Sequence, residues 1–181
     1  MRCCILLGRL MLPAPETWIA PDGTPVTIRP IRADDLGLET EFVDGLSPAS
    51  SYQRLMSARR LSPDELRHFT DIDYAHEMAL IAVTSVGGRE RQVGVARYVK
   101  STSVPGEAEF AIVLSDDWQK RGLGTKLLSS LVAAAKRDGV RRVVGTTSSA
   151  NSAMLALAGK MGFKRALHPG SASTTTLALE L

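Results

Sequence analysis

The chain has 181 residues, of which 44% are hydrophobic and 23% are charged, and its formal net charge is +3. This length fits one domain with its own core, and the composition excludes collagen-like, low-complexity and wholly disordered proteins. Lysine and arginine are scattered along the chain and aromatic residues make up only 5% of it, so we do not expect a nucleic-acid-binding protein.

The first 20 residues are expected to form a flexible tail ahead of a single domain over residues 21–181. An apolar stretch in this tail runs from Cys3 to Leu12 but is interrupted by Arg9. It is too short to cross a bilayer, and no clear small-residue cleavage site follows it. We therefore predict neither a membrane anchor nor a secretory signal.

Three residues of this tail bear on the start site and the compartment. Met11 is a second candidate for the first translated residue, beside Met1. Cys3 and Cys4 are the only cysteines, and an adjacent pair makes neither a disulfide framework nor a zinc site. The lack of cysteine elsewhere predicts a reducing, cytoplasmic compartment.

A strand and three helices are expected in the first part of the domain. Residues 26–31 alternate as a strand does, after a turn signal at residues 21–25. Acidic, serine and proline residues at favoured capping positions mark the three helix starts. The helices are expected from Asp34 to about Leu46, from Ser47 through Met56, and from Ser62 to near Phe69.

Three strands are expected next, pairing antiparallel. Residues 78–86 form an apolar run of strand length, and residues 92–100 should complete a hairpin with it across a somewhat long loop. The third strand is expected over residues 107–114.

The remaining elements alternate between helix and strand. A helix over residues 124–138 carries an apolar stripe at helical spacing, and Gly139 fits its C-terminal cap. A strand over 141–147, a helix over 151–161 and a strand over 174–181 follow. This order predicts a mixed α/β domain built on a central sheet.

The segment from Leu114 to Leu127 is the most informative part of the chain, because a strand there runs into a glycine-bearing loop that opens a helix. Glycines let backbone N–H groups approach an anion closely, and a helix N-terminus favours negative charge. Lys120, Arg121 and Lys126 add positive charge around the same place. The segment therefore predicts a site for phosphate or pyrophosphate.

A Gly-x-Gly pair alone is weak evidence, since an ordinary turning loop explains it about as well. Two common phosphate motifs are excluded. The chain has no Gly-x-x-x-x-Gly-Lys-Ser/Thr segment, which rules out a Walker-type loop, and no Gly-x-Gly-x-x-Gly after its first strand, which argues against a Rossmann dinucleotide site.

The run Gln119-Lys120-Arg121-Gly122-Leu123-Gly124 resembles the Gln/Arg-x-x-Gly-x-Gly/Ala motif of the GNAT acetyltransferase family. Asn151, followed by Met154 and then Gly162-Phe163, is similar to the next element of that family. The resemblance covers about residues 26–181. It implies the GNAT fold, in which helices flank a central mixed, mostly antiparallel sheet.

The resemblance also implies acetyl-CoA as cosubstrate. In the family, the loop amides bind the pyrophosphate, the preceding strand pairs with the pantetheine arm, and the asparagine contacts that arm. The cofactor-binding residues implied here are Ile112, Val113, Leu114, Gln119, Lys120, Arg121, Gly122, Leu123, Gly124, Thr125 and Asn151.

Several other segments resemble a subgroup, the GNAT domain of the Pat-type bacterial protein lysine acetyltransferases. They are residues 29–35, 46–52, 69–74, 77–80 and the Ala-Glu-Phe-Ala run at 108–111. The resemblance implies that Glu109 of this last run is the general base. Glu107 is the reserve candidate, because it points to the same face of the strand, and a merely solvated strand residue is the alternative for Glu109.

The chemistry expected is direct transfer in a ternary complex, since no cysteine accompanies the loop and no Ser-His-Asp set is evident. A free lysine amine has a pKa of about 10.4 and must lose a proton before it attacks the thioester. A backbone N–H near Val113 or Leu114 could stabilise the oxyanion. Many family members have a tyrosine acid seven residues after the motif asparagine, but Ala158 stands there, so none is expected.

His68, His76 and His168 lack metal-ligand spacing, so no metal site is expected. Trp18 is expected to pack the tail against the domain, and Trp118 to anchor the glycine loop. Three functions stay open: a protein lysine acetyltransferase, an acetyltransferase for a small amine, and a non-catalytic acyl-CoA-binding module. A homodimer is compatible with the family by analogy only.

Overall fold

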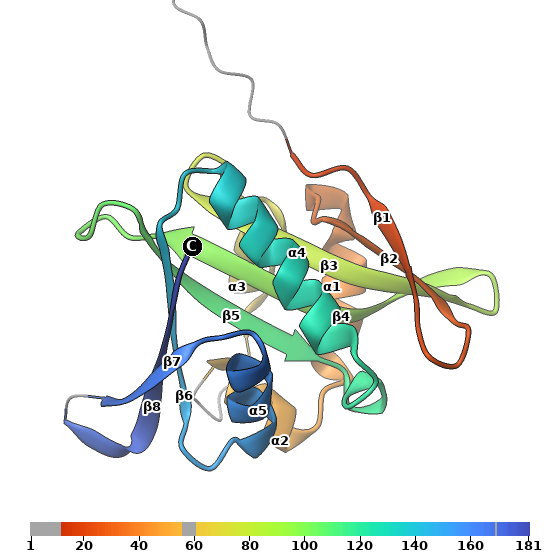
Figure 1. The fold of residues 1–181 in the computed structure, drawn as a ribbon. Helices are drawn as coiled ribbons and strands as arrows, with labels where there is room; N and C mark the ends of the chain where they lie inside the picture. The colour runs from red at the N-terminus through yellow and green to blue at the C-terminus, as the bar shows by residue number, and fades with distance from the viewer. Residues whose placement is uncertain (1–11, 56–60, 169) are drawn as a thin grey trace, which may run out of the picture.

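The computed structural model describes residues 12–55, 61–168 and 170–181. An eight-stranded sheet runs through the molecule in the order β1-β2-β3-β4-β5-β6-β8-β7 (Figure 1). Its strands are β1 Glu16–Ile19, β2 Pro25–Pro30, β3 Glu77–Val86, β4 Arg89–Lys100, β5 Glu107–Leu114, β6 Arg142–Ser148, β7 Lys164–His168 and β8 Ser171–Glu180. Neighbouring strands pair antiparallel except β5 and β6, which are parallel. The predicted central mixed, mostly antiparallel sheet is confirmed.

Helices lie on both faces of this sheet. They are α1 Leu36–Asp44, α2 Pro48–Leu55, α3 Pro63–Thr70, α4 Leu123–Arg137 and α5 Ser152–Lys160, with short 3-10 turns at Ala33–Asp35 and Asp116–Trp118. Helix α4 crosses one face over β3, β4 and β5, while α1 and α3 lie behind the sheet in Figure 1. No helix in the described ranges is both long and apolar enough to cross a membrane.

The unbroken run of hydrophobic residues in β3 is explained by two apolar cores, one on each face of the sheet. Leu80 and Ala82 pack into the core beneath α4, whereas Ala79, Ile81 and Val83 pack into the core beneath α1. A central strand covered on both faces needs apolar side chains at every position, because alternate residues point to opposite sides.

Three expectations need correction. The tail predicted through residue 20 is too long, because β1 pairs with β2 over residues 16–19; Cys3, Cys4 and Met11 lie outside the described residues. The hairpin loop between β3 and β4 is tight, not long: Gly87 and Gly88 both have positive φ, as a two-residue hairpin turn requires. Strand β7 was not predicted, and His168 lies at its end.

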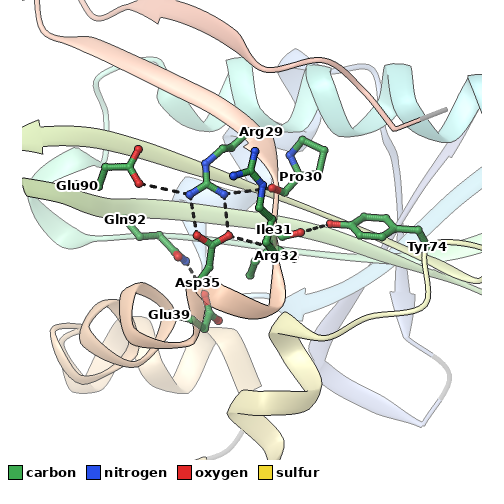
Figure 2. Close-up of polar contacts among 9 residues, drawn as sticks. All are labelled: Arg29, Pro30, Ile31, Arg32, Asp35, Glu39, Tyr74, Glu90 and Gln92. Atoms are coloured by element: carbon green, nitrogen blue, oxygen red, sulfur yellow. Dashed lines mark hydrogen bonds and ion pairs between the residues drawn. The ribbon is translucent and has the colours of Figure 1, made fainter. Parts of the chain in front are cut away.

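A buried ion pair fixes α1 to the sheet (Figure 2). Arg29 on β2 donates from both terminal nitrogens to the two oxygens of Asp35, each at 2.7 Å. Asp35 also accepts a hydrogen bond from the backbone N–H of Arg32 at 2.8 Å. The bidentate geometry gives the Pat-like segment 29–35 a structural role, which is to hold the start of α1 against β2.

Neighbouring polar contacts extend this cluster between α1, β4 and the loop before β3 (Figure 2). Glu39 is fully buried and accepts a hydrogen bond from Nε2 of Gln92 at 2.5 Å. The Tyr74 hydroxyl donates to the backbone oxygen of Ile31. Burial, and secondarily the charge of Asp35, raises the pKa of Tyr74 to about 12, so the hydroxyl stays a donor at neutral pH.

Candidate functional site

Strands β5 and β6 separate partway along their length. They pair only at Glu107 to Glu109, opposite Arg142 to Val144. Just beyond, the ring of Phe110 lies against Gly145, where a Cβ would sit 2.6 Å from the ring, and it packs on Phe163 with centroids 5.1 Å apart. The glycine thus makes room for an aromatic ring at the point where the strands part. Sequence reasoning missed this arrangement, because nothing local marks Gly145.

A cavity of about 450 Å³ opens where the strands part. Successive residues of β5 line it, namely Glu109, Phe110, Ala111, Ile112, Val113 and Leu114. Since alternate side chains of a strand point to opposite faces, the cavity reaches both faces of the sheet. Val113 belongs to the core beneath α1, and Ile112 and Leu114 pack on the core beneath α4. Thr146, Thr147 and α5 form the other wall.

The glycine loop borders this cavity and opens α4. Gly122 is the N-cap with φ of 91°, and Lys120 has φ of 58°, the one non-glycine residue with positive φ in the described ranges. Left-handed residues in a loop of this kind are typical of concave anion sites formed by backbone N–H groups. The first hydrogen bond across the helix start runs from Lys126 N–H to the Gly122 oxygen at 3.2 Å, so the N–H groups before it are not used within the helix.

Asp116 ties the loop to the start of α2. Its carboxylate accepts hydrogen bonds from the backbone N–H and hydroxyl of Ser47, at 3.0 and 2.8 Å, and from the hydroxyl of Ser50 at 2.8 Å. Gln119 donates from Nε2 to the same Ser50 oxygen at 3.1 Å. Burial alone would raise the pKa of Asp116, but the hydrogen bonds from Ser47 and Ser50 outweigh it and lower the pKa. The sequence marked Ser47 as a helix cap but gave no sign of this partner.

The three cations expected around the loop do not act together. Lys120 lines the cavity. Arg121 stacks on the ring of Trp118, 4.5 Å from its centroid, and pairs with Asp22. Lys126 pairs with Glu16 at 2.6 Å and lines a separate hollow beside β1 and β2, so its predicted contribution to the loop is wrong. Trp118 is buried and anchors the loop, as expected.

The predicted cofactor residues fall into two groups. Those that line the cavity are Ile112, Val113, Leu114, Gln119, Lys120 and Asn151. The others, Arg121, Gly122, Leu123, Gly124 and Thr125, form the turn and first residues of α4. Leu123 is fully buried in the core, so only its backbone is available to a ligand.

Asn151 has a local structural role as well as its place at the cavity. Its Oδ1 accepts from the Met154 N–H at 3.1 Å, which caps α5, and its Nδ2 donates to Oγ1 of Thr147 at 3.2 Å. Both ends of the amide are therefore engaged between β6 and α5. Its predicted contact with a pantetheine arm stays a prediction.

Glu109 and Glu107 have different surroundings. Glu109 is exposed and lines the cavity on the α1 side of the sheet. Glu107 lies outside the cavity lining and accepts a hydrogen bond from Nη1 of Arg142 at 3.1 Å. Arg142 also contacts Glu180 at 3.2 Å. The geometry thus favours Glu109 over its reserve as the carboxylate facing a substrate.

Arg97 and Phe69 also line the cavity, although sequence reasoning did not select them. The guanidinium lies 4.4 Å from the Phe69 ring centroid, and Nη2 donates to the Phe69 backbone oxygen at 2.9 Å. Arg97 pairs in register with Ala111, so its side chain and that of Glu109 emerge on the same face. Alternation along β4 could have placed Arg97 on that face, but not beside α3.

The histidines take no part in this site. His76 contacts Asp73 through Nδ1 at 2.5 Å, and His168 contacts Thr176 at 3.2 Å. Among the residues that the structure describes, no three His, Cys, Asp or Glu side chains are grouped to hold a metal ion.

Comparison with known proteins gives consistent matches. The model of the acetyltransferase (GNAT) domain family matches residues 26–164. An acetyltransferase of Pseudomonas aeruginosa is 37% identical over 143 residues, which cover 78% of this chain and 76% of that protein.

Solved structures of acetyltransferases also resemble this chain. The GNAT domain of S. lividans PAT superposes with a TM-score of 0.84 at 26% identity, covering 94% of this chain and all of that one. The putative acetyltransferase yncA of Salmonella typhimurium, solved with its cofactor acetyl-CoA, has a TM-score of 0.67 at 21% identity over 86% of this chain and 94% of that one, a likeness that shows the fold. The family model alone spans well over half of the residues. The chain therefore belongs to the GNAT acetyltransferase family.

Proposed function

We propose that the chain transfers the acetyl group of acetyl-CoA to a primary amine, by direct attack in a ternary complex with Glu109 as general base, and that the amine is that of a protein lysine. The observation that carries this proposal is the continuous cavity at the parted strands. It joins Gln119 and Lys120 of the glycine loop to Glu109 on the other face of the sheet. A cofactor and an acceptor could thus meet from opposite sides.

The residues present suit acetyl-CoA. The turn from Gln119 to Thr125 offers backbone N–H groups and a helix N-terminus to the pyrophosphate. Residues 112–114 of β5 pair with β4 but lie beyond its pairing with β6, so the backbone groups on the edge that faces β6 are available to the amide groups of the pantetheine arm. Acetyl-CoA in the yncA structure of Salmonella typhimurium supports the same ligand here.

The acceptor amine must be neutral to attack the thioester carbonyl carbon. A free lysine amine has a pKa of about 10.4, so it needs a base at neutral pH. The Glu109 carboxylate takes the proton directly or through one water. The C–N bond forms first, which gives a tetrahedral intermediate, and the collapse of this intermediate breaks the C–S bond. A backbone N–H near Val113 or Leu114 stabilises the oxyanion.

The thiolate of coenzyme A leaves with its electron pair. A thiol of this kind has a pKa of about 8.5, so its departure needs little acid assistance. Ala158, where many relatives have tyrosine, is fully buried and has no proton to give. Solvent therefore protonates the thiolate. An acyl-enzyme is not required, since the only cysteines, Cys3 and Cys4, precede the domain.

Protein lysine as the acceptor rests on two observations. The chain is similar to the GNAT domain of S. lividans PAT over 94% of its length, and Glu109 is an exposed residue that lines the cavity. The Arg97–Phe69 pair favours the second candidate, a small amine, because it encloses part of the acceptor side. Peptide and small-amine substrates compared at equal concentration separate the two.

Replacement of Glu109 tests the mechanism and also the non-catalytic alternative. Glu109→Gln should lower kcat about 10²-fold or more, while coenzyme A binding stays unchanged, because a general base contributes in that range. Glu107→Gln is the matched control, since it removes a carboxylate from the same strand outside the cavity. Full turnover in Glu109→Gln would remove this residue from the mechanism. A wild-type protein that binds acetyl-CoA and acetylates no amine would instead be a binding module.

A further inference from the structure

The turn between β1 and β2 reaches the glycine loop from the other end of the chain. Backbone hydrogen bonds close this turn, from Ala20 N–H to the Thr24 oxygen at 2.9 Å and from Gly23 N–H to the Ala20 oxygen at 2.8 Å. Asp22, within it, accepts from the Thr24 N–H through Oδ1 at 3.1 Å and pairs through Oδ2 with Nη2 of Arg121. The carboxylate is thus held by its own turn and aimed at the loop.

A second contact shows that the hairpin is docked on the loop. Trp18 of β1 lies against Gly122, where a Cβ would sit 3.5 Å from Cζ2 of the indole. Trp18 also packs, partly buried, on the core beneath α4. The β1–β2 hairpin therefore touches two successive residues of the loop that opens α4.

This docking places a negative charge where the cofactor's negative charge is expected. The side chains of Arg121 and Asp22 are 32% and 46% exposed, so the pair lies at the surface and can be exchanged for another anion. Arginine binds phosphate as readily as carboxylate, through the same donors. A phosphate arriving at the loop meets a cation that is already paired, with a carboxylate beside it.

We propose that Asp22 competes with the phosphates of coenzyme A for Arg121, and so weakens the binding of the cofactor and sets its affinity. The inference rests on the proposed function, because it takes coenzyme A as the occupant of the loop. Asp22 is a positioning residue in this role, since it acts through Arg121.

The contacts of Arg121 explain why Asp22 acts as a competitor rather than a necessary support. The guanidinium is stacked on the buried Trp118, and Nη1 donates to the Asp117 backbone oxygen at 3.4 Å. Both contacts come from the loop side and remain when the carboxylate is removed. Loss of Asp22 then frees donors of an arginine that stays in place.

The test is a double-mutant cycle on coenzyme A binding, measured by titration calorimetry on the full chain. Asp22→Asn should tighten the dissociation constant roughly two- to fivefold, the range that an exposed ion pair is worth. The gain should vanish in an Arg121→Gln background, because the competition needs the arginine. Glu16→Gln is the matched control: it removes a carboxylate from the same hairpin, but one that pairs with Lys126 beside the separate hollow.

Two further readouts separate competition from a structural effect. The gain in Asp22→Asn should diminish at high salt, and the KM for acetyl-CoA should fall while the KM for the acceptor is unchanged. A structural defect would only weaken binding. The inference is overturned, while the proposed function stands, if the wild type binds coenzyme A and Asp22→Asn binds it with equal or weaker affinity. It is also overturned if Asp22→Asn gives the same gain in affinity in the Arg121→Gln background. No binding of coenzyme A by the wild type would overturn the proposed function with it.

Discussion

The ring of Phe110 occupies the space that a side chain at Gly145 would need, and the pairing of β5 with β6 ends one residue before this contact. A Cβ at position 145 would lie 2.6 Å from the ring and 3.1 Å from the Phe110 oxygen. Phe110 is buried and packs on Phe163, so the ring has little freedom to move away. The cavity can therefore keep its shape only with a glycine at position 145.

Gly145→Ala should therefore destabilise the protein by about 1–3 kcal/mol, as overpacking of a core does, and should weaken coenzyme A binding. Urea unfolding and calorimetry measure the two effects. Gly37→Ala is the control, because nothing lies within 4 Å of its added methyl group on α1. A Gly145→Ala variant as stable as the wild type would mean that the contact does not restrict the strands.

Asp116→Asn should loosen the link between the glycine loop and α2 and cost about 1 kcal/mol, because the amide makes weaker hydrogen bonds with Ser47 and Ser50 than the carboxylate does. The pKa of Asp116 is lowered in the folded protein. A depressed carboxyl contributes stability above its unfolded pKa of about 3.9, and the contribution is lost as pH falls through the folded pKa.

The wild type should consequently lose more stability than Asp116→Asn when pH falls below about 4, and the two unfolding curves should converge in acid. Urea midpoints across the acid range measure this. A constant difference between the two proteins at every pH would show that the charge of Asp116 has no part in the link.

Asp35→Asn should cost about 3–5 kcal/mol, because it removes the bidentate partner of the buried Arg29 guanidinium and leaves it to the exposed carboxylate of Glu90 at 3.5 Å. Denaturant unfolding monitors the loss. Asp64→Asn, which breaks the exposed Arg67–Asp64 pair, is the control and should cost no more than about 1 kcal/mol. Equal losses in the two variants would contradict a special role for the buried pair.

Local patterns predicted much of the fold. The strand over residues 107–114 and the helix after the glycine loop were predicted to within one residue of their observed ends. Strand alternation, helical periodicity and capping are patterns of residues close together in the sequence, so they can be recognised without the structure. The four-residue β1 and the exposed β7 carry no such pattern. They form because β2 and β8 offer them a hydrogen-bonding edge.

Only those parts of the site that lie close together in the sequence were predictable. The glycine loop and Glu109 lie within 16 residues of one another in the sequence. The contacts that shape the loop come from afar: Asp22 is 99 residues from Arg121, and Ser50 is 66 residues from Asp116. A single sequence contains no signal for such pairs, because each partner has an ordinary local setting.

Thermal unfolding with and without acetyl-CoA tests the central claim, that the loop and cavity form an acetyl-CoA site, most directly. At about 100 times its dissociation constant the ligand should stabilise the fold by about 2.7 kcal/mol. For a chain of this size, that corresponds to a rise in Tm of about 5–10 °C, clearly larger than with ATP or NAD at the same concentration. A cooperative transition that acetyl-CoA does not shift would contradict the account.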